Sequence, residues 1–181
     1  MERRDQILET AAALFAEHGY HGVSINDLGA ACGVTGPALY KHFRGKQAIL
    51  SEMLVSISDE LLDEGRRRVR AAASPSDALD ALIDWHVNFA LGRKPLIVVQ
   101  DRDWSALPVE ARERVRETQL KYVEVWAKVL RAIHDDLAPQ SARAMVHAAF
   151  GLINSTPHSA VLPQDEMAAV LTRMARAALT A

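Results

Sequence analysis

The chain lacks most of what a secreted, metal-binding or catalytic protein needs. Its 181 residues contain one cysteine, Cys32, which excludes an intramolecular disulfide and predicts a buried thiol. The seven histidines are scattered, and neither Glu-x-x-His nor His-Glu-x-x-His occurs. The ligand spacings of helical-bundle metalloenzymes and zinc proteases are therefore absent. We expect no metal, no cofactor and no catalytic residue, and an enzyme is the first alternative that these absences weigh against.

Membrane and export signals are missing as well. The uncharged run over residues 144–164 contains His147, Asn154 and Pro157, which would be costly in lipid. The opening MERRDQILET has no apolar core of the kind a signal peptide carries. We therefore expect a cytoplasmic protein that makes no contact with a membrane.

Glycine and proline are sparse, at nine and seven residues, while Ala, Leu, Glu and Arg recur. This composition and a helical periodicity that runs nearly end to end predict an all-α fold. The expected helices cover about residues 4–18, 24–33, 35–43, 46–70, 74–91, 95–103, 108–133, 139–155 and 165–179. Gly19 and Gly33 end the first two helices, Ser24 and Asp27 form a capping box, and Ser74 or Ser76 caps the fifth helix. We predict a three-helix domain over residues 1–46 and a larger helical bundle over residues 47–181.

Acidic residues are absent between Thr35 and Leu50, although the whole chain carries a net charge of −2. The first helices follow the pattern of a helix-turn-helix, and VTGPALYKHFRGK, residues 34–46, forms its last part. On a helical wheel Pro37, Tyr40, Lys41 and Arg44 lie opposite Leu39 and Phe43. An exposed face with an aromatic hydroxyl, cations and a slender tip suits the major groove of DNA. The candidate DNA-binding residues are Ser24, Thr35, Gly36, Pro37, Tyr40, Lys41, His42 and Lys46.

The run from Ile7 to Leu50 resembles the DNA-binding domain of TetR-type transcriptional repressors. The residues that carry the resemblance are Phe15, Gly19, Ser24, Ile25, Leu28, Gly33, Val34, Leu39, Tyr40, His42, Phe43 and Lys46. The family commonly has glycine where this chain has Pro37, with a longer polar residue where this chain has Gly36. The base-reading rules of other members therefore do not transfer.

The larger domain has helices whose inner faces mix aromatic and polar side chains. A filled core with satisfied polar groups is one interpretation; a ligand cavity is the other, and it is favoured for the set as a whole given the resemblance. The candidate ligand-binding residues are Trp85, His86, Phe89, Trp104, Gln119, Tyr122, Trp126 and Phe150. The pattern is similar to that of regulators of fatty-acid and branched-chain acyl-CoA catabolism, while a hydrophobic drug or a sterol-like molecule would suit the same lining.

The last two helices are rich in alanine and allow close approach of a second subunit. The resemblance implies a two-fold homodimer through these helices that binds a palindromic operator in double-stranded DNA. A small-molecule inducer that fits only when the fourth helix is tilted would then change the distance between the two DNA-binding domains of the dimer and release the repressor. An architectural DNA-binding protein without a ligand is the second rival.

Overall fold

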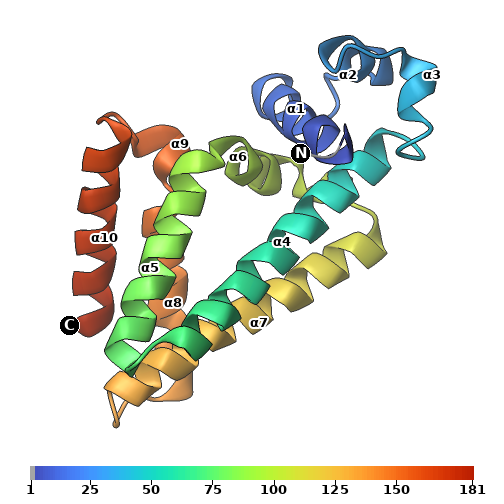
Figure 1. The fold of residues 1–181 in the computed structure, drawn as a ribbon. Helices are drawn as coiled ribbons and strands as arrows, with labels where there is room; N and C mark the ends of the chain where they lie inside the picture. The colour runs from blue at the N-terminus through green and yellow to red at the C-terminus, as the bar shows by residue number, and fades with distance from the viewer. Residues whose placement is uncertain (1–2) are drawn as a thin grey trace. The chain divides into compact units, whose positions relative to one another are not determined.

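The computed structural model describes residues 3–181, and over these residues the chain is all-α, as the sequence predicts. The helices are α1 (Arg3–His18), α2 (Ile25–Ala31), α3 (Gly36–Leu39), α4 (Lys46–Ala71), α5 (Pro75–Gly92), α6 (Lys94–Asp103), the 3-10 helix η1 (Trp104–Ala106), α7 (Val109–Ile133), α8 (Pro139–Ile153), α9 (Thr156–Ser159) and α10 (Gln164–Thr180) (Figure 1). Within residues 3–181, none of the helices combines the length and apolarity that crossing a membrane requires.

The chain forms two compact units. The first contains the chain up to Ile57 together with Pro95–Arg116, and the second contains Ser58–Lys94 together with Glu117–Ala181. The helices α4 and α7 each have residues in both units. The predicted division into functional domains at residue 46 stays a prediction.

In the first unit, α2 packs against both α1 and α3. Ser24 and Asp27 form the predicted capping box, in which each side chain bonds the backbone N–H of the other residue. Gly19 and Gly33 have φ angles of 79° and 67°, the left-handed conformation in which glycine commonly ends a helix. The fully buried Ile7, Phe15, Leu28 and Leu39 fill the space between the three helices, and the thiol of Cys32 is buried as expected.

The third helix is shorter than the predicted span of residues 35–43. It ends at Leu39, because the N–H groups of Lys41 and His42 donate to carbonyls three residues back rather than four. This tighter turn is followed by Gly45, whose φ angle of 141° starts the reversal into α4. Leu39 and Phe43 are nevertheless both buried, as the wheel predicts.

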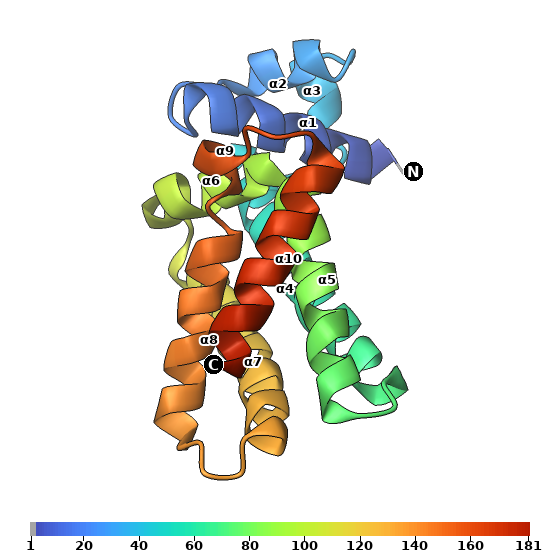
Figure 2. The ribbon, with the colours of Figure 1, turned by 90° about the vertical axis from the view of Figure 1, so that its left-hand side faces the viewer.

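In the second unit, α10 packs against α5 and α8 and lies beside both in the two views (Figures 1 and 2). Ser74, one of the two predicted caps, accepts from the N–H of Asp77 at the start of α5. The short α9 lies between two expected helices, in a stretch where the sequence predicted none. It is held by Thr156, whose buried hydroxyl donates to the Ala90 carbonyl of α5 at 2.7 Å.

Candidate functional site

The outward face of α3 and the turn after it is polar and open to solvent. Pro37, Lys41 and Arg44 are exposed, and the ring of Tyr40 is 56% exposed although it is a large aromatic side chain. The helical-wheel prediction that these four residues face solvent is confirmed. A tyrosine hydroxyl and two cations on a surface without a carboxylate between residues 35 and 50 can bind an anionic backbone.

The tip of α3 fits tightly against α2. Gly36 is buried, and a Cβ atom there would lie 2.4 Å from the Asn26 side-chain oxygen. The absence of a side chain at Gly36 therefore seats α3 on α2. Thr35 stands at the N-cap position and is exposed, but its hydroxyl makes no capping bond, so it remains free to bond a partner.

Ser24 and Lys46, two further candidates, have partners inside the protein. The Ser24 hydroxyl belongs to the capping box of α2. The Lys46 ammonium donates to the carbonyls of Tyr20 and Val23 at 2.7 and 2.6 Å and lies 4.3 Å from the centre of the Tyr20 ring. Two of its three N–H donors thus hold the loop between α1 and α2, and one is left for an external acceptor.

Arg4 contacts both the turn after α3 and helix α4, and it was not among the candidate residues predicted from the sequence. Its guanidinium forms an ion pair with the Glu52 carboxylate, donates to the carbonyl of His42 and lies 4.3 Å from the centre of the Phe43 ring. His42 itself is exposed. The pKa of Arg4 is raised, chiefly by its hydrogen bond to Glu52. Nothing in the local sequence pattern pairs residues 4 and 52, because the contact joins side chains of α1 and α4 that are far apart in the sequence.

In the second unit, five of the predicted ligand-binding residues form one aromatic cluster. His86 stacks on Phe150 with ring centres 4.4 Å apart, and Phe150 lies 5.5 Å from Tyr122 and 5.1 Å from Trp126. Phe89 completes the cluster at 5.8 Å from His86. The rings come from α5, α7 and α8, so these five candidates lie together, while their predicted role in binding a ligand stays a prediction.

The polar atoms inside this aromatic cluster largely bond one another. Tyr122 Oη lies 3.4 Å from His86 Nδ1, and His86 Nε2 lies 3.1 Å from Asn154 Oδ1. Burial lowers the pKa of His86 to about 4, against a smaller opposing effect of the Asn154 hydrogen bond, so the ring is neutral near pH 7. Burial also raises the pKa of Tyr122. The row Tyr122–His86–Asn154 is a neutral hydrogen-bonded chain that links α7, α5 and α8.

One donor in the cluster is poorly satisfied within the described residues. The Nε1 atom of Trp126, a fully buried side chain, has no acceptor there in good hydrogen-bond geometry, although its N–H lies near enough to the Tyr122 hydroxyl to oppose part of the rise in the pKa of Tyr122. A buried N–H without an acceptor costs about 1–3 kcal/mol, and such groups are rare in folded proteins. An acceptor placed near Trp126 Nε1 would therefore be favourable.

The other predicted ligand-binding residues lie elsewhere. Trp85 is half-buried beside Arg68, whose guanidinium carbon is 5.3 Å from its ring, and its Nε1 also lacks a partner within residues 3–181. Gln119 is half-buried on α7. Trp104 begins η1 in the first unit. Their roles in binding a ligand remain predictions.

Sequence reasoning missed two residues of the aromatic cluster. Asn154 follows Phe150 by one helical turn, a spacing that already places it on the same face. Gly65 of α4 is buried against Tyr122, and a Cβ atom there would lie 2.6 Å from Tyr122 Cε2. A glycine inside a helix is itself a signal, because it weakens the helix and is usually kept for close packing.

The described residues include no group of three or more His, Cys, Asp or Glu side chains placed to hold a metal ion. The two regions carry groups that suit binding. The helix-turn-helix has exposed cations and hydroxyls, and the cluster has aromatic rings and a buried N–H donor.

Comparison with known families gives two matches. Residues 7–53 match the model described as bacterial regulatory proteins, tetR family, and residues 72–158 match the model of the tetracyclin repressor-like C-terminal domain. Among curated proteins, the HTH-type transcriptional repressor KstR2 of Rhodococcus jostii is 28% identical over 131 residues. That alignment covers 72% of the chain and 64% of KstR2, so the chain spans less than two thirds of the length of this relative.

Solved structures share the fold over nearly the whole chain. A TetR-family transcriptional regulator from Bordetella parapertussis is 27% identical with a TM-score of 0.83, covering 95% of this chain and 93% of that one. The regulator AibR, solved in complex with isovaleryl coenzyme A and operator DNA, is 23% identical with a TM-score of 0.78, covering 96% of this chain and 97% of AibR. At that identity the likeness to AibR establishes the fold.

Proposed function

The chain belongs to the TetR family of bacterial regulatory proteins, and on that premise we propose that it is a repressor released from its operator by a small hydrophobic or acyl-CoA-type inducer. The observation that carries the proposal is the presence in one chain of an exposed, acid-free helix-turn-helix face and a buried aromatic cluster, in which the Trp126 N–H has no acceptor in good geometry among residues 3–181. A regulator of this kind is not an enzyme and acts on chromosomal DNA in the cytoplasm.

The DNA side of the proposal rests on α3 and its flanks. Tyr40 and Lys41 are exposed and would bond phosphates or base edges, and the free Thr35 hydroxyl lies at the tip of the helix. His42 and the third donor of Lys46 would add phosphate contacts. Gly36 and Ser24 would act indirectly, since they hold α3 and α2 in place.

The ligand side rests on the aromatic cluster. AibR, which shares the fold, binds isovaleryl coenzyme A. In this chain a thioester carbonyl on a short acyl group would satisfy Trp126 Nε1 while the acyl group packs on aromatic rings. Another apolar molecule with an acceptor group would meet the same requirements.

The proposed partner in DNA binding is a second copy of the chain. Val161, Leu162 and Met174, before and within α10, are 86%, 44% and 49% exposed, and α8 packs alongside α10. Apolar surface of this kind suits an interface between protomers. A dimer would present two helix-turn-helix units to half-sites about 34 Å apart, the spacing of successive major grooves.

Helix α4 connects the two ends of the mechanism. Its residue Gly65 touches Tyr122 of the aromatic cluster, and the same continuous helix begins at Lys46, beside the DNA-binding face. A ligand that displaces Tyr122 toward Gly65 would therefore act on α4 itself. Releasing most of the protein from DNA requires a differential affinity of about 5 kcal/mol, shared between two protomers.

The test is operator binding with and without ligand. The operator is first selected from random duplex DNA with purified protein, and its affinity is then measured by fluorescence anisotropy. Butyryl, isovaleryl, lauroyl and stearoyl coenzyme A are added in turn, with free coenzyme A as the control. We expect at least one acyl-CoA to weaken operator binding where coenzyme A does not.

Two results would contradict the proposal. Failure to select any duplex sequence would refute the DNA-binding role. Binding of an acyl-CoA that leaves operator affinity unchanged would separate ligand binding from regulation and would favour an architectural DNA-binding protein.

A further inference from the structure

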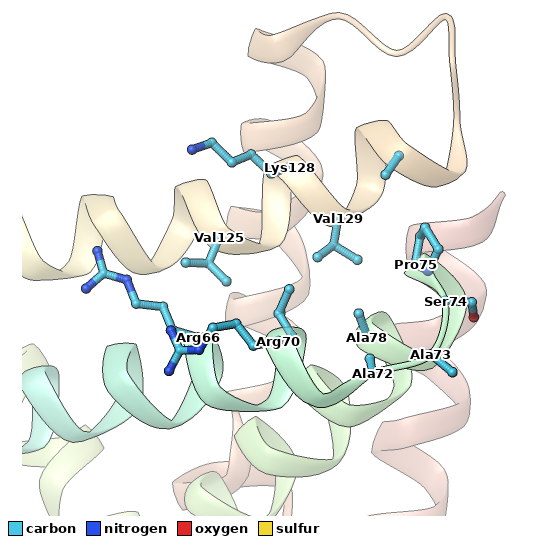
Figure 3. A pocket seen from close by; sticks show the side chains of 12 residues that line it. Arg66, Arg70, Ala72, Ala73, Ser74, Pro75, Ala78, Val125, Lys128 and Val129 are labelled. Atoms are coloured by element: carbon cyan, nitrogen blue, oxygen red, sulfur yellow. The ribbon is translucent and has the colours of Figure 1, made fainter.

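A groove lies away from the rings of the aromatic cluster, where the end of α4, the turn into α5 and the second half of α7 meet (Figure 3). Its volume is about 560 Å³, within the range of about 300–1,000 Å³ typical of small-molecule sites. None of the five aromatic residues of the cluster lines it. From α7, the residues Val125, Lys128 and Val129 line the groove, whereas Tyr122 and Trp126 belong to the aromatic cluster.

The charged residues of the groove are all cations. Arg66 and Arg70 extend from α4 and Lys128 from α7, and no Asp or Glu lines the groove (Figure 3). Positive charge without acidic neighbours along the groove attracts an anion. Arginine adds a planar fork that matches the oxygens of a carboxylate or phosphate.

These cations are poorly neutralised by the protein. Arg66 lies 3.9 Å from the Asp63 carboxylate, at the outer limit of an ion pair. Within residues 3–181, no ion pair or hydrogen bond is made by the side chains of Arg70 and Lys128. Asp77, at the start of α5, accepts from the Ser74 hydroxyl at 2.7 Å.

The floor of the groove is apolar. Val129 and Ala78 are 5% and 3% exposed, while Val69 and Val125 are half-buried. A hydrated inorganic ion gains nothing from such a floor, whereas an alkyl chain buries its surface there. A groove with a cationic rim and an apolar floor is complementary to a molecule that carries both features.

We propose that this groove binds a small amphipathic organic anion, an aliphatic carboxylate or phosphate monoester, with the anionic group on Arg70 and Lys128 and the chain on Val69, Val125 and Val129. This site is separate from the aromatic cluster and would bind its ligand whether or not the chain represses transcription. Because the groove lies between α4 and α7, its occupant would also bear on the helix proposed above to transmit the inducer signal.

The experiment is isothermal titration calorimetry on the full chain with octyl phosphate, octanoate and octanol. The three probes share one alkyl chain, and the first two distinguish a phosphate from a carboxylate as the favoured group. Arg70→Gln with Lys128→Gln removes both unpaired cations, and both side chains are exposed, so the fold is expected to survive. We expect this variant to bind the favoured anion about tenfold more weakly, and added salt to weaken the parent's binding of that anion but not of octanol.

Arg67→Gln with Lys121→Gln is the matched control. It removes the same charge from the same two helices, from exposed residues outside the groove. Equal affinity of the two double variants for the anion would overturn the proposal, because the anion would then bind elsewhere, for example at the aromatic cluster. Absence of anion binding to the parent would overturn it as well. Neither result depends on DNA, so failure here is distinguishable from failure of the repressor function.

Discussion

The helix-turn-helix face and the aromatic cluster satisfy their polar groups in opposite ways. Tyr40 and Lys41 are exposed, with polar ends that face solvent. In the cluster, Tyr122, His86 and Asn154 bond one another inside the unit. A side chain without an internal partner costs little to replace in the folded protein, whereas a side chain in a buried network supports the fold as well as any ligand. Substitutions on the helix-turn-helix face should therefore change DNA binding without changing stability. Substitutions in the aromatic cluster should change both ligand binding and stability.

The largest expected effect belongs to the exposed face. Tyr40→Ala with Lys41→Ala would remove four contacts from a dimer, each worth about 1 kcal/mol, and so weaken operator binding about a thousandfold. The unfolding midpoint should stay that of the parent. Leu120→Ala with Lys121→Ala, a similar pair of exposed residues on α7, is the control. A folded Tyr40/Lys41 variant with parental affinity would mean that α3 does not enter DNA.

The next effect is a pH dependence of stability that comes from His86. Its pKa is about 4 in the folded protein and 6.5 in an ordinary environment, so between these values the unfolded chain binds the extra proton. The contribution of His86 to the free energy of unfolding is therefore fully present above pH 6.5. It declines as the pH falls toward 4, by about 3 kcal/mol in total.

Urea unfolding of the parent and of His86→Gln at pH 7 and pH 4.5, at one protein concentration, measures this difference. The carboxylates titrate in both proteins and cancel in the comparison. We expect the variant to lose less stability on acidification. Equal losses would show that His86 is accessible to protons in the folded state.

A smaller effect is expected where α4 meets the aromatic cluster. Gly65→Ala places a Cβ atom against the Tyr122 ring, and overpacking of this kind costs about 2 kcal/mol. Gly151→Ala, a helical glycine with open space around it, is the control and should be neutral or stabilising. If Gly65→Ala also changes operator affinity without ligand, α4 carries the signal; unchanged affinity would argue for another route.

The smallest effect is expected at Lys46, where the contrast between the two regions breaks down. This residue is part of the proposed DNA-binding set, yet its ammonium holds the carbonyls of Tyr20 and Val23. Lys46→Met should lower the free energy of unfolding by about 1 kcal/mol, since the site is only half-buried. The salt dependence of operator binding, measured alongside, shows whether its third donor reaches a phosphate.

Much of the architecture follows from local sequence. The capping box at Ser24, the terminating Gly19 and Gly33 and the cap at Ser74 depend on residues close in sequence, so their predictions are confirmed. The predicted end of α3 is too late, because the apolar spacing of Leu39 and Phe43 fits a helix and a tight turn equally well.

The sites are predictable in part for the same reason. The aromatic rings of α5, α7 and α8 share helical faces that the sequence displays, and they come together in the structure. Contacts between distant residues, such as Arg4 with Glu52 and Gly65 with Tyr122, depend on how helices pack and leave no local pattern. The cationic groove combines three residues from two helices for which periodicity indicates only a solvated surface.

The end of α1 is held by a residue from far along the chain. Arg102 of α6 donates to the carbonyls of Phe15 and Ala16 and bonds the buried Asp103 carboxylate. These carbonyls belong to the last turn of α1, where a cation favourably completes the helix. A fragment cut after α4 would keep all the side chains proposed to bind DNA, yet it would lose Arg102, and the end of its first helix is expected to fray. A transfer of the helix-turn-helix to another protein would therefore have to include the α6 segment that carries Arg102.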